Sequence, residues 1–245
     1  MSSNDFLKMP NWYPALASFA LKTSFVKLPP AAVKALADGV GNGEKCDMES
    51  EISRQVINEL ALVMDNITGN SFVNVDLCAP TDTERFAEKR GAVYSANSAW
   101  FYLTRSEKVA RSAAAGEVEY ICVRPFRRVN SAREFRLFIK DGALAAASQY
   151  NLDRHYRRLE GVRDKYWQLL LDFVNSNIWK LPVKTLVMDV YITSKDEILV
   201  FDLNPWGEPT APLLLRSWER DWQEQGGLVL MDPPTAISGD VKVSF

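Results

Sequence analysis

The sequence predicts an α+β fold in which antiparallel β-hairpins surround one long helix. Two pairs of strand-like segments occupy the second half of the chain, and a strong helical pattern lies between them. Apolar residues make up 47% of the 245 residues, which is enough to bury a substantial core in one large domain or in two lobes. We therefore expect an ordered protein without repeats or low-complexity segments.

The first half is predicted to be mainly helical. Residues 1–30 are expected to be irregular because prolines interrupt them. Gly69 is a plausible stop for the helix predicted over 48–66. The elements expected next are a short helix over 31–38, a glycine-rich break over 39–43, a helix over 48–66, a strand with one solvent-exposed face over 72–77, a polar turn or helix start over 81–88, a short strand over 92–94, and one helix or two short ones over 97–112.

The second half is predicted to run from strands through a helix to strands. Asp141-Gly142 is a strong hairpin turn, because two-residue turns favour residues that tolerate a positive φ. Apolar residues recur at spacings of three and four between 156 and 178, which predicts one long amphipathic helix. The strands expected around these features are 118–126, 135–139, 144–150, 186–192 and 197–202, the last two forming a hairpin that turns at Ser194-Lys195-Asp196.

This last hairpin carries the most informative side chains. Asp202 and Asn204 share a face because they are two apart on a strand, and Asp189 lies on the partner strand. Their oxygens are the hard ligands that Mg²⁺ prefers, and Mg²⁺ completes its octahedron with water and phosphate oxygens. The pattern therefore predicts a magnesium site with a nucleotide nearby. The alternative is a strand that ends in an Asx-Pro turn with exposed acids. The apolar run Ile198–Phe201 argues against it, because an acid at the end of such a run needs a partner.

Composition excludes several classes of function. The net charge of -2 provides no electrostatic footprint for nucleic acid or an anionic membrane. No apolar stretch approaches the roughly 20 residues that a membrane span needs, and the first residues lack the pattern of a secretory signal. We therefore expect a cytoplasmic protein, in the form of a monomer.

The cysteines and the histidine argue against several kinds of site. Cys46, Cys78 and Cys122 are odd in number and widely spaced, which indicates buried thiols in a reducing compartment rather than a disulfide framework. His155 is the only histidine and lies in a polar run that is typical of a solvated helix start. A single histidine argues against a histidine-based metal site and against a Ser-His-Asp triad.

Seven short motifs occur in the order found in one protein family. They are Asn11-Trp12-Tyr13-Pro14 with Lys27-Leu28-Pro29, Cys78-Ala79-Pro80-Thr81-Asp82, Val123-Arg124-Pro125-Phe126, Glu134-Phe135-Arg136, Ser148-Gln149, Met188-Asp189-Val190-Tyr191, and Phe201-Asp202-Leu203-Asn204-Pro205-Trp206-Gly207-Glu208. On these motifs, from about residue 10 to about residue 220, the chain resembles the cell division cycle protein 123 family. These are eukaryotic ATP-grasp proteins that assist assembly of translation initiation factor 2.

The resemblance implies an ATP-grasp fold whose two lobes carry antiparallel sheets and bind ATP with Mg²⁺ between them. The lobes are expected over 1–115 and over 116–245, the second containing the metal-binding hairpin. The resemblance implies that Asp189, Asp202 and Asn204 hold Mg²⁺ and that the strand from Cys122 through Val123 to Phe126 offers backbone hydrogen bonds to adenine. It also implies that Arg124 and Arg136 neutralise phosphate and that Glu134 and Gln149 orient the sugar or base. Ala79 and Asp82 are expected to lie beside the nucleotide. The alternative for Glu134 and Arg136 is a salt bridge across one strand face.

Two departures from the family pattern concern positive charge. The family has an arginine where this chain has Thr81 and a lysine where it has Asn74. Each charge-assisted contact to phosphate is worth roughly 1.5 to 3 kcal/mol, so two uncompensated losses would weaken ATP binding by two to four decades. Arg85, Lys89 or Arg90 are candidates to replace the missing charge.

Three functions follow from these expectations. The first is an ATP-dependent factor that clamps a protein partner, a translation factor subunit by resemblance. Trp206, Trp218 and Trp222 are either anchors for that partner or part of the core. The second is a carboxylate-amine ligase of the wider ATP-grasp superfamily, in which positioning and charge neutralisation carry the chemistry. The third is a pseudoenzyme that binds no nucleotide.

Overall fold

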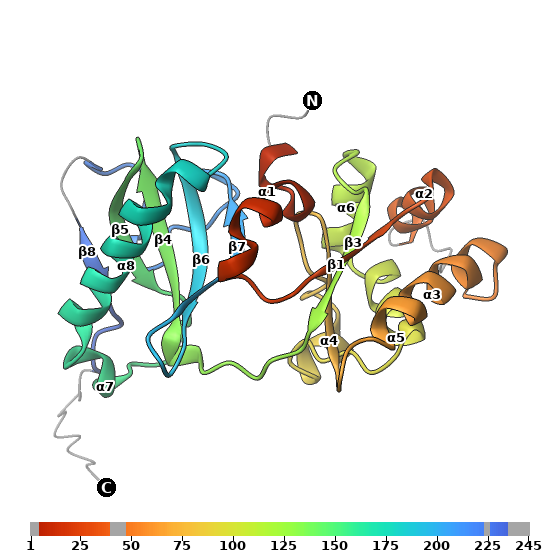
Figure 1. Ribbon diagram of the computed structural model, residues 1–245, viewed down its shortest axis with the longest axis horizontal. Coiled ribbons are helices and arrows are strands. Elements are labelled where there is room, and N and C mark those ends of the chain that lie inside the picture. Colours follow the sequence, from red (N-terminus) through yellow and green to blue (C-terminus); the bar gives the residue numbers. More distant parts are fainter. Residues whose placement is uncertain (1–4, 40–47, 223–225, 235–245) are drawn as a thin grey trace, which may run out of the picture.

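The computed structural model describes residues 5–39, 48–222 and 226–234. Its strands form two separate sheets that lie side by side, with helices packed around each (Figure 1). The predicted α+β class is therefore confirmed. Within the described part of the chain, no helix is long and apolar enough to cross a membrane.

The first sheet has three antiparallel strands in the order β1 (Ser24–Lys27), β3 (Tyr120–Pro125), β2 (Ser71–Val75). The helices packed around it are α2 (Pro30–Asp38), α3 (Glu51–Met64), α4 (Glu84–Glu88), α5 (Ala96–Thr104) and α6 (Glu107–Ala114). The side chain of Ser50 caps α3, as its position before the apolar pattern favours. Trp100 lies at the centre of this core, where its indole N–H donates to Ser53 Oγ at 2.9 Å.

The second sheet has five strands in the order β7-β6-β4-β5-β8. They are β4 (Glu134–Lys140), β5 (Ala143–Gln149), β6 (Leu186–Ile192), β7 (Ile198–Asn204) and β8 (Gly227–Val229). Every pair is antiparallel except β5 with β8. The predicted turn between β4 and β5 is confirmed, since Asp141 and Gly142 have φ of 51° and 87°. The strand β8 was not predicted, because three residues are too few for a periodic signal.

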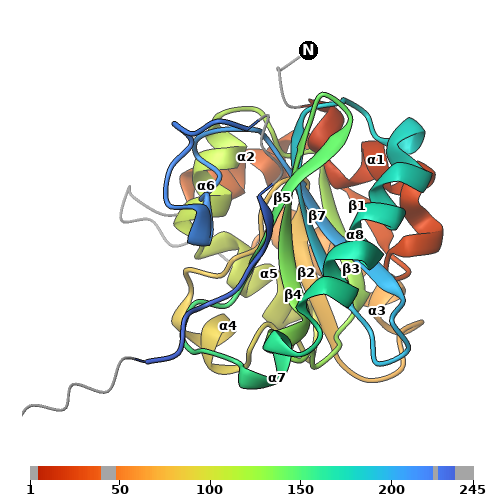
Figure 2. The ribbon, with the colours of Figure 1, turned by 90° about the vertical axis from the view of Figure 1, so that its left-hand side faces the viewer.

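The two faces of the second sheet differ in chemistry. One face packs against α8 (Arg163–Asn177) through alternate residues such as Leu137 and Met188, and α1 (Met9–Leu16) lies on the same side (Figure 2). The intervening residues, Arg136 among them, point to the opposite face because side chains alternate along a strand. Charged side chains of β4, β6 and β7 therefore gather on the side away from α8.

The expectation that residues 1–30 are irregular was wrong. They contain η1 (Asp5–Leu7), α1, η2 (Ala17–Phe19) and β1. Proline suggested a break, but Pro10 lies in the first turn of α1, where a missing N–H leaves no helical bond unmade. Leu7, Met9 and Trp12 are buried in the core that covers the α8 side of the second sheet, so tertiary packing stabilises this short helix.

The helix predicted over 156–178 is two helices, α7 (Arg157–Glu160) and α8, which are separated at Gly161 and followed by η4 (Ile178–Lys180). For 97–112 the alternative of two short helices is confirmed by α5 and α6. The segment predicted over 92–94 makes only an isolated bridge, from Val93 to Ser71.

The predicted strand over 72–77 corresponds to β2, but its supposedly solvent-exposed face is buried. Asn74 is 8% exposed and Asp76 is 1% exposed. The alternation of polar and apolar residues showed two faces correctly, but it could not show that other parts of the chain cover the polar one. Of the predicted glycine-rich break, residues 40–43 lie outside the described residues, as does Cys46.

The predicted lobe boundary between 115 and 116 stays a prediction. The strand β3 follows that boundary in sequence yet is the central strand of the first sheet. The chain passes from the first sheet to the second between β3 and β4, through η3 (Ser131–Arg133). Residues 116–125 therefore contribute to the wall of the first sheet that faces any site between the sheets.

Candidate functional site

The strand register brings three charged residues of the second sheet together. Asp189 on β6 lies opposite Asp202 on β7, and Arg136 on β4 lies opposite Asp189 from the other side. A bulge follows Asp189 in the pairing of β6 with β7. The three side chains therefore form a row across neighbouring strands, on the face away from α8.

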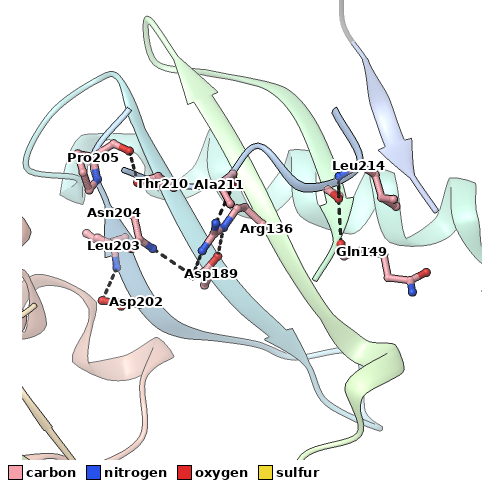
Figure 3. A network of polar contacts seen from close by, with 11 residues as sticks. Arg136, Gln149, Asp189, Asp202, Leu203, Asn204, Pro205, Thr210, Ala211 and Leu214 are labelled. Atoms are coloured by element: carbon pink, nitrogen blue, oxygen red, sulfur yellow. Dashed lines mark hydrogen bonds and ion pairs between the residues drawn. The ribbon is translucent and has the colours of Figure 1, made fainter. Parts of the chain in front are cut away.

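Arg136 and Asp189 form a buried, bidentate ion pair (Figure 3). Arg136 Nε donates to Asp189 Oδ1 at 2.7 Å and its Nη2 donates to Oδ2 at 2.8 Å, while Nη1 donates to the carbonyl of Ala211 at 2.9 Å. The alternative of a salt bridge between Arg136 and Glu134 was wrong, because the guanidinium is aligned with Asp189 on the adjacent strand. Burial and the nearby Asp189 raise the pKa of Glu134.

Asp202 is the acid that lacks such compensation. It accepts a hydrogen bond from the N–H of Leu203 at 2.9 Å, and among the described residues it forms no ion pair. Burial, followed by the proximity of Asp189, raises its pKa to about 7, although Arg124 and Arg136 oppose the shift. A cation between Asp189 and Asp202 would relieve this repulsion.

Asn204 completes a donor set that fits Mg²⁺. Its amide Nδ2 donates to Asp189 Oδ2 at 3.0 Å, so its Oδ1 retains acceptor capacity. The described residues contain no group of three or more His, Cys, Asp or Glu side chains that could hold a metal ion. The donors present are instead two carboxylates and one amide oxygen. Such a sparse oxygen set suits a cation that keeps waters and binds phosphate oxygens.

A cavity of about 490 Å³ extends from this row to the first half of the chain. Arg136, Asn204 and the segment 209–211 line one wall, and Cys78, Lys108 and Arg111 line the other. Its size is within the range of small-molecule sites, and its walls come from both halves of the chain.

The first-half wall of the cavity consists of the loop after β2 and the start of α6. Asp82 accepts from Ser106 Oγ at 2.5 Å and from the backbone N–H of Lys108 at 3.1 Å. Burial opposes ionisation of Asp82, but these hydrogen bonds outweigh it and lower the pKa. Asp82 therefore ties the loop to α6. Ala79 lies in the same loop, half-buried against the first core.

Cys122 and Val123 do not offer free backbone groups for adenine. Both lie in the middle of β3, where Cys122 is paired with Phe25 of β1 and with Asn74 of β2. A central strand uses its N–H and C=O groups in ladders on both sides. Within these ladders the two residues pair with β1 and β2, and their role toward adenine stays a prediction. Burial raises the pKa of the Cys122 thiol well above its usual value, which agrees with the prediction of an unreactive buried cysteine.

Arg124 bridges the two sheets. Its guanidinium donates to the carbonyl of Phe201 on β7 at 3.2 Å and lies 4.7 Å from the ring centroid of Phe72 on β2. Burial lowers its pKa, and the nearby Asp202 opposes that effect. Arg124 thus lies close to the predicted metal site, as expected, but its contacts also hold the first sheet against β7.

Gln149 does not point to a ligand. Its Nε2 donates to the carbonyls of Asn151 and Arg154 at 2.5 and 2.9 Å, and its Oε1 accepts from the N–H of Met231 at 3.3 Å. Gln149 is fully buried, and its polar atoms are used within the protein. In this structure it organises the loop after β5, and its role in orienting sugar or base stays a prediction.

The tryptophans of the predicted partner surface pack within the protein. Trp206, Trp218 and Trp222 surround Phe138 on the face of the second sheet that carries the charged row. Only Trp222 is buried, and the other two are half-buried. Of the two expectations for these residues, the core role is the one that the contacts support.

Sequence reasoning missed Lys108 and Arg111 as residues of the cavity. They lie on an exposed helical stretch in which they look like ordinary solvated charges. The only available signal was the pair Asp82 and Ser106, both typical capping residues, but no local pattern links residues that far apart. Arg85, Lys89 and Arg90, the expected replacements for the missing charge, do not line this cavity.

Comparison with known proteins identifies the family. The model of the D123 family matches residues 49–225. A translation initiation factor eIF2 assembly protein of Vanderwaltozyma polyspora is 32% identical over 127 residues, which are 51% of this chain and 32% of that protein. Cell division cycle protein 123 of Candida glabrata is 35% identical over 96 residues, which are 38% of this chain and 27% of that protein. The aligned part is thus about a third or less of these relatives' length.

A solved structure shares the fold over nearly the whole chain. C-terminally truncated Cdc123 from Schizosaccharomyces pombe aligns with a TM-score of 0.78 and 21% identity, over 96% of this chain and 99% of that one. The two-sheet α+β architecture is therefore that of Cdc123. The similarity that the seven motifs predicted is confirmed, and the chain belongs to the D123 family.

Proposed function

We propose that this chain is an ATP-grasp protein that binds ATP with Mg²⁺ in the cavity between its sheets and acts as an assembly factor for a subunit of translation initiation factor 2. The names of the curated relatives support the second part, although only about a third of their length is matched. The site supports the first part. Because translation factors are assembled in the cytoplasm, the proposal includes that location.

One observation carries the nucleotide proposal. Asp189 and Asp202 lie opposite each other on β6 and β7, beside Asn204, which lines the cavity, and the repulsion between the two acids is only partly compensated. A half-buried carboxylate with a pKa of about 7 is unusual for a purely structural residue, and strongly shifted groups cluster at functional sites. A divalent cation would offset the repulsion from Asp189, the second cause of the shift after burial, and would favour the ionised form of Asp202.

The residues then have separate tasks. Asp189, Asp202 and Asn204 would hold the metal, and Arg136 keeps Asp189 ionised and oriented through its two hydrogen bonds. Arg124 adds positive charge close to Asp202. In an assembly factor, bound ATP would hold the two sheets in one arrangement; in the alternative function, a carboxylate-amine ligase, it would supply a phosphate to activate a carboxylate.

Calorimetric titration with ATP tests this proposal. The unmodified protein should bind ATP in the presence of Mg²⁺, and Asp202→Ala should abolish the Mg²⁺-dependent part of the affinity while the fold stays intact. Asp196→Ala is the matched control, because Asp196 is an acid at the turn of the same hairpin and pairs only with exposed Lys165. Equal affinity in Asp202→Ala and the unmodified protein would refute the metal assignment. Absence of ATP binding by the unmodified protein would favour the pseudoenzyme.

A second measurement distinguishes assembly factor from ligase. Purified subunits of translation initiation factor 2 should bind the protein more tightly with ATP and Mg²⁺ than without, and phosphate release should stay at background during binding. Stoichiometric phosphate release that depends on an amine and a carboxylate substrate would instead support the ligase.

A further inference from the structure

The charges that line the cavity are divided between its two walls. Arg136, on the second-sheet wall, is already neutralised by Asp189. Lys108 and Arg111 line the opposite wall, on α6, and neither forms an ion pair among the described residues. The cations that remain available to a ligand therefore lie on α6, across the cavity from Asn204.

We propose that Lys108 and Arg111 of α6 hold the terminal phosphates of the bound nucleotide, facing the metal ligands of β6 and β7 across the cavity. This inference rests on the proposed nucleotide site. It names the residues that would distinguish a polyphosphate from an uncharged nucleoside. It also identifies the source of the charge that Thr81 and Asn74 do not supply.

Lys108 occupies the place of a missing cation. Its Nζ donates to Thr81 Oγ1 at 2.8 Å, so an ammonium group lies beside the position at which the family pattern has an arginine. An ammonium has three donor hydrogens, and one bond to a hydroxyl leaves two for other acceptors. The uncharged Thr81 hydroxyl orients Lys108 without neutralising it.

The backbone at Lys108 is fixed to the cavity wall. Asp82 accepts from the N–H of Lys108, and Ser106, which also donates to Asp82, caps α6 by accepting from the N–H of Val109 at 3.2 Å. Because the cap and the loop after β2 form one hydrogen-bonded unit, α6 cannot turn away without breaking several bonds. Arg111 follows on the next turn of the same helix, three residues on, and so shares its face.

Cys78 lies in the cavity between α6 and the end of β7. Cys78 lines the cavity together with Lys108 and Asn204. Burial first, and then Asp202 and Asp82, raise the pKa of its thiol to about 12, while Lys108 opposes the shift. One half-buried thiol thus shares the cavity with Asn204, a proposed metal ligand, and with Lys108, a proposed phosphate ligand. A phosphate beside Cys78 would therefore meet the metal on one side and Lys108 on the other.

The acidic group on this wall does not cancel the charge. Glu117 also lines the cavity, but its Oε2 accepts from Ser112 Oγ at 3.1 Å, which holds it near the end of α6. Asp82 is occupied by its hydrogen bonds to Ser106 and Lys108. Among the residues that line this wall, two cations, Lys108 and Arg111, face one acid, Glu117, so the lining itself carries an excess of positive charge.

Titrations with ATP, tripolyphosphate and adenosine test the inference in the presence of Mg²⁺. We expect Lys108→Met to weaken ATP binding about tenfold and the double variant Lys108→Met/Arg111→Met about a hundredfold, because each contact to phosphate is worth roughly 1.5 kcal/mol or more. Adenosine binding should stay unchanged, and Lys108→Arg should retain most of the affinity. The control is Lys89→Met, which removes an exposed cation outside the cavity and should have no effect.

The outcomes separate this inference from the proposed function. The inference would be overturned if the double variant bound ATP as tightly as the unmodified protein does, or if it lost as much affinity for adenosine as for ATP. In either case, ATP binding by the unmodified protein would still support the proposed function. If the unmodified protein bound tripolyphosphate through Lys108 but not ATP, the nucleotide function would fail, and only the assignment of Lys108 to a polyphosphate would remain. Binding of neither would overturn both.

Discussion

Asp189 and Asp202 are two acids at one register position of one hairpin, yet their environments are opposite. Asp189 accepts two hydrogen bonds from Arg136 and one from Asn204. Asp202 accepts one from the backbone and is destabilised as an anion by burial and by Asp189. The first acid is therefore part of the folded framework even without a ligand. The second costs stability until a cation binds.

The two acids are both proposed metal ligands, but this difference gives them separate roles: Asp189 belongs to the folded framework, and Asp202 depends on the cation. An ion pair that is buried and bidentate keeps a carboxylate charged and in place. A carboxylate that lacks a partner is the one whose ionisation a metal can drive. Substitutions of the two acids test the comparison, and a third substitution, at Thr81, tests the charge on the opposite wall of the cavity. The largest effect is expected at Asp189.

Asp189→Ala should lower the free energy of unfolding by about 3 to 5 kcal/mol, because it leaves the buried Arg136 guanidinium uncompensated. Urea denaturation measures the loss. The double variant Arg136→Met/Asp189→Leu should recover much of it, since it removes both charges. A loss below about 1 kcal/mol in Asp189→Ala would mean that Arg136 finds another partner and that the ion pair is not part of the framework.

Asp202→Asn should change how stability depends on pH. The pKa of Asp202 in the folded state, about 7, is raised above the ordinary value of 3.8, so the folded state binds this proton more tightly than the unfolded state does. Stability is thus highest below about pH 4 for this group and is lost as pH rises to about 7. The loss should be roughly 1 to 3 kcal/mol in the unmodified protein.

Asparagine cannot ionise, so the difference in unfolding free energy between the two proteins should grow in favour of Asp202→Asn from about pH 4 to about pH 7. Thermal or urea unfolding at several pH values measures it, and taking the difference cancels other groups such as Glu134. Parallel pH profiles in the two proteins would show that Asp202 is no more buried or repelled than an ordinary acid.

Thr81→Arg should have the smallest effect. If Thr81 lay beside an uncompensated site, an arginine there would tighten ATP binding by a decade or more. Because Lys108 already lies at Thr81, we expect a change below about threefold, as two cations repel each other and exposed charges are screened. Titration with ATP and adenosine at low and high salt measures this. A large gain that is specific to ATP would mean that Lys108 does not supply the charge.

Much of the second half could be predicted because its signals are local. Alternation along β6 and β7, the turn at Asp141-Gly142 and the shared face of Asp202 and Asn204 all depend on residues close in sequence. The same reasoning failed for residues 1–30, where tertiary contacts stabilise a short helix with two prolines. It could not show the partners of Gln149 either, because they include Met231 on a distant segment.

The sequence by itself determined the α+β class, the family and the acids of the hairpin, because periodicity, turn chemistry and motif order are properties of neighbouring residues. Only the tertiary structure decided which acid is neutralised and which cations face the cavity. Arg136 and Asp189 are 53 positions apart, and Lys108 and Thr81 are 27 positions apart. Strand order and helix capping bring such residues together, and the charge balance of a site depends on these distant pairs.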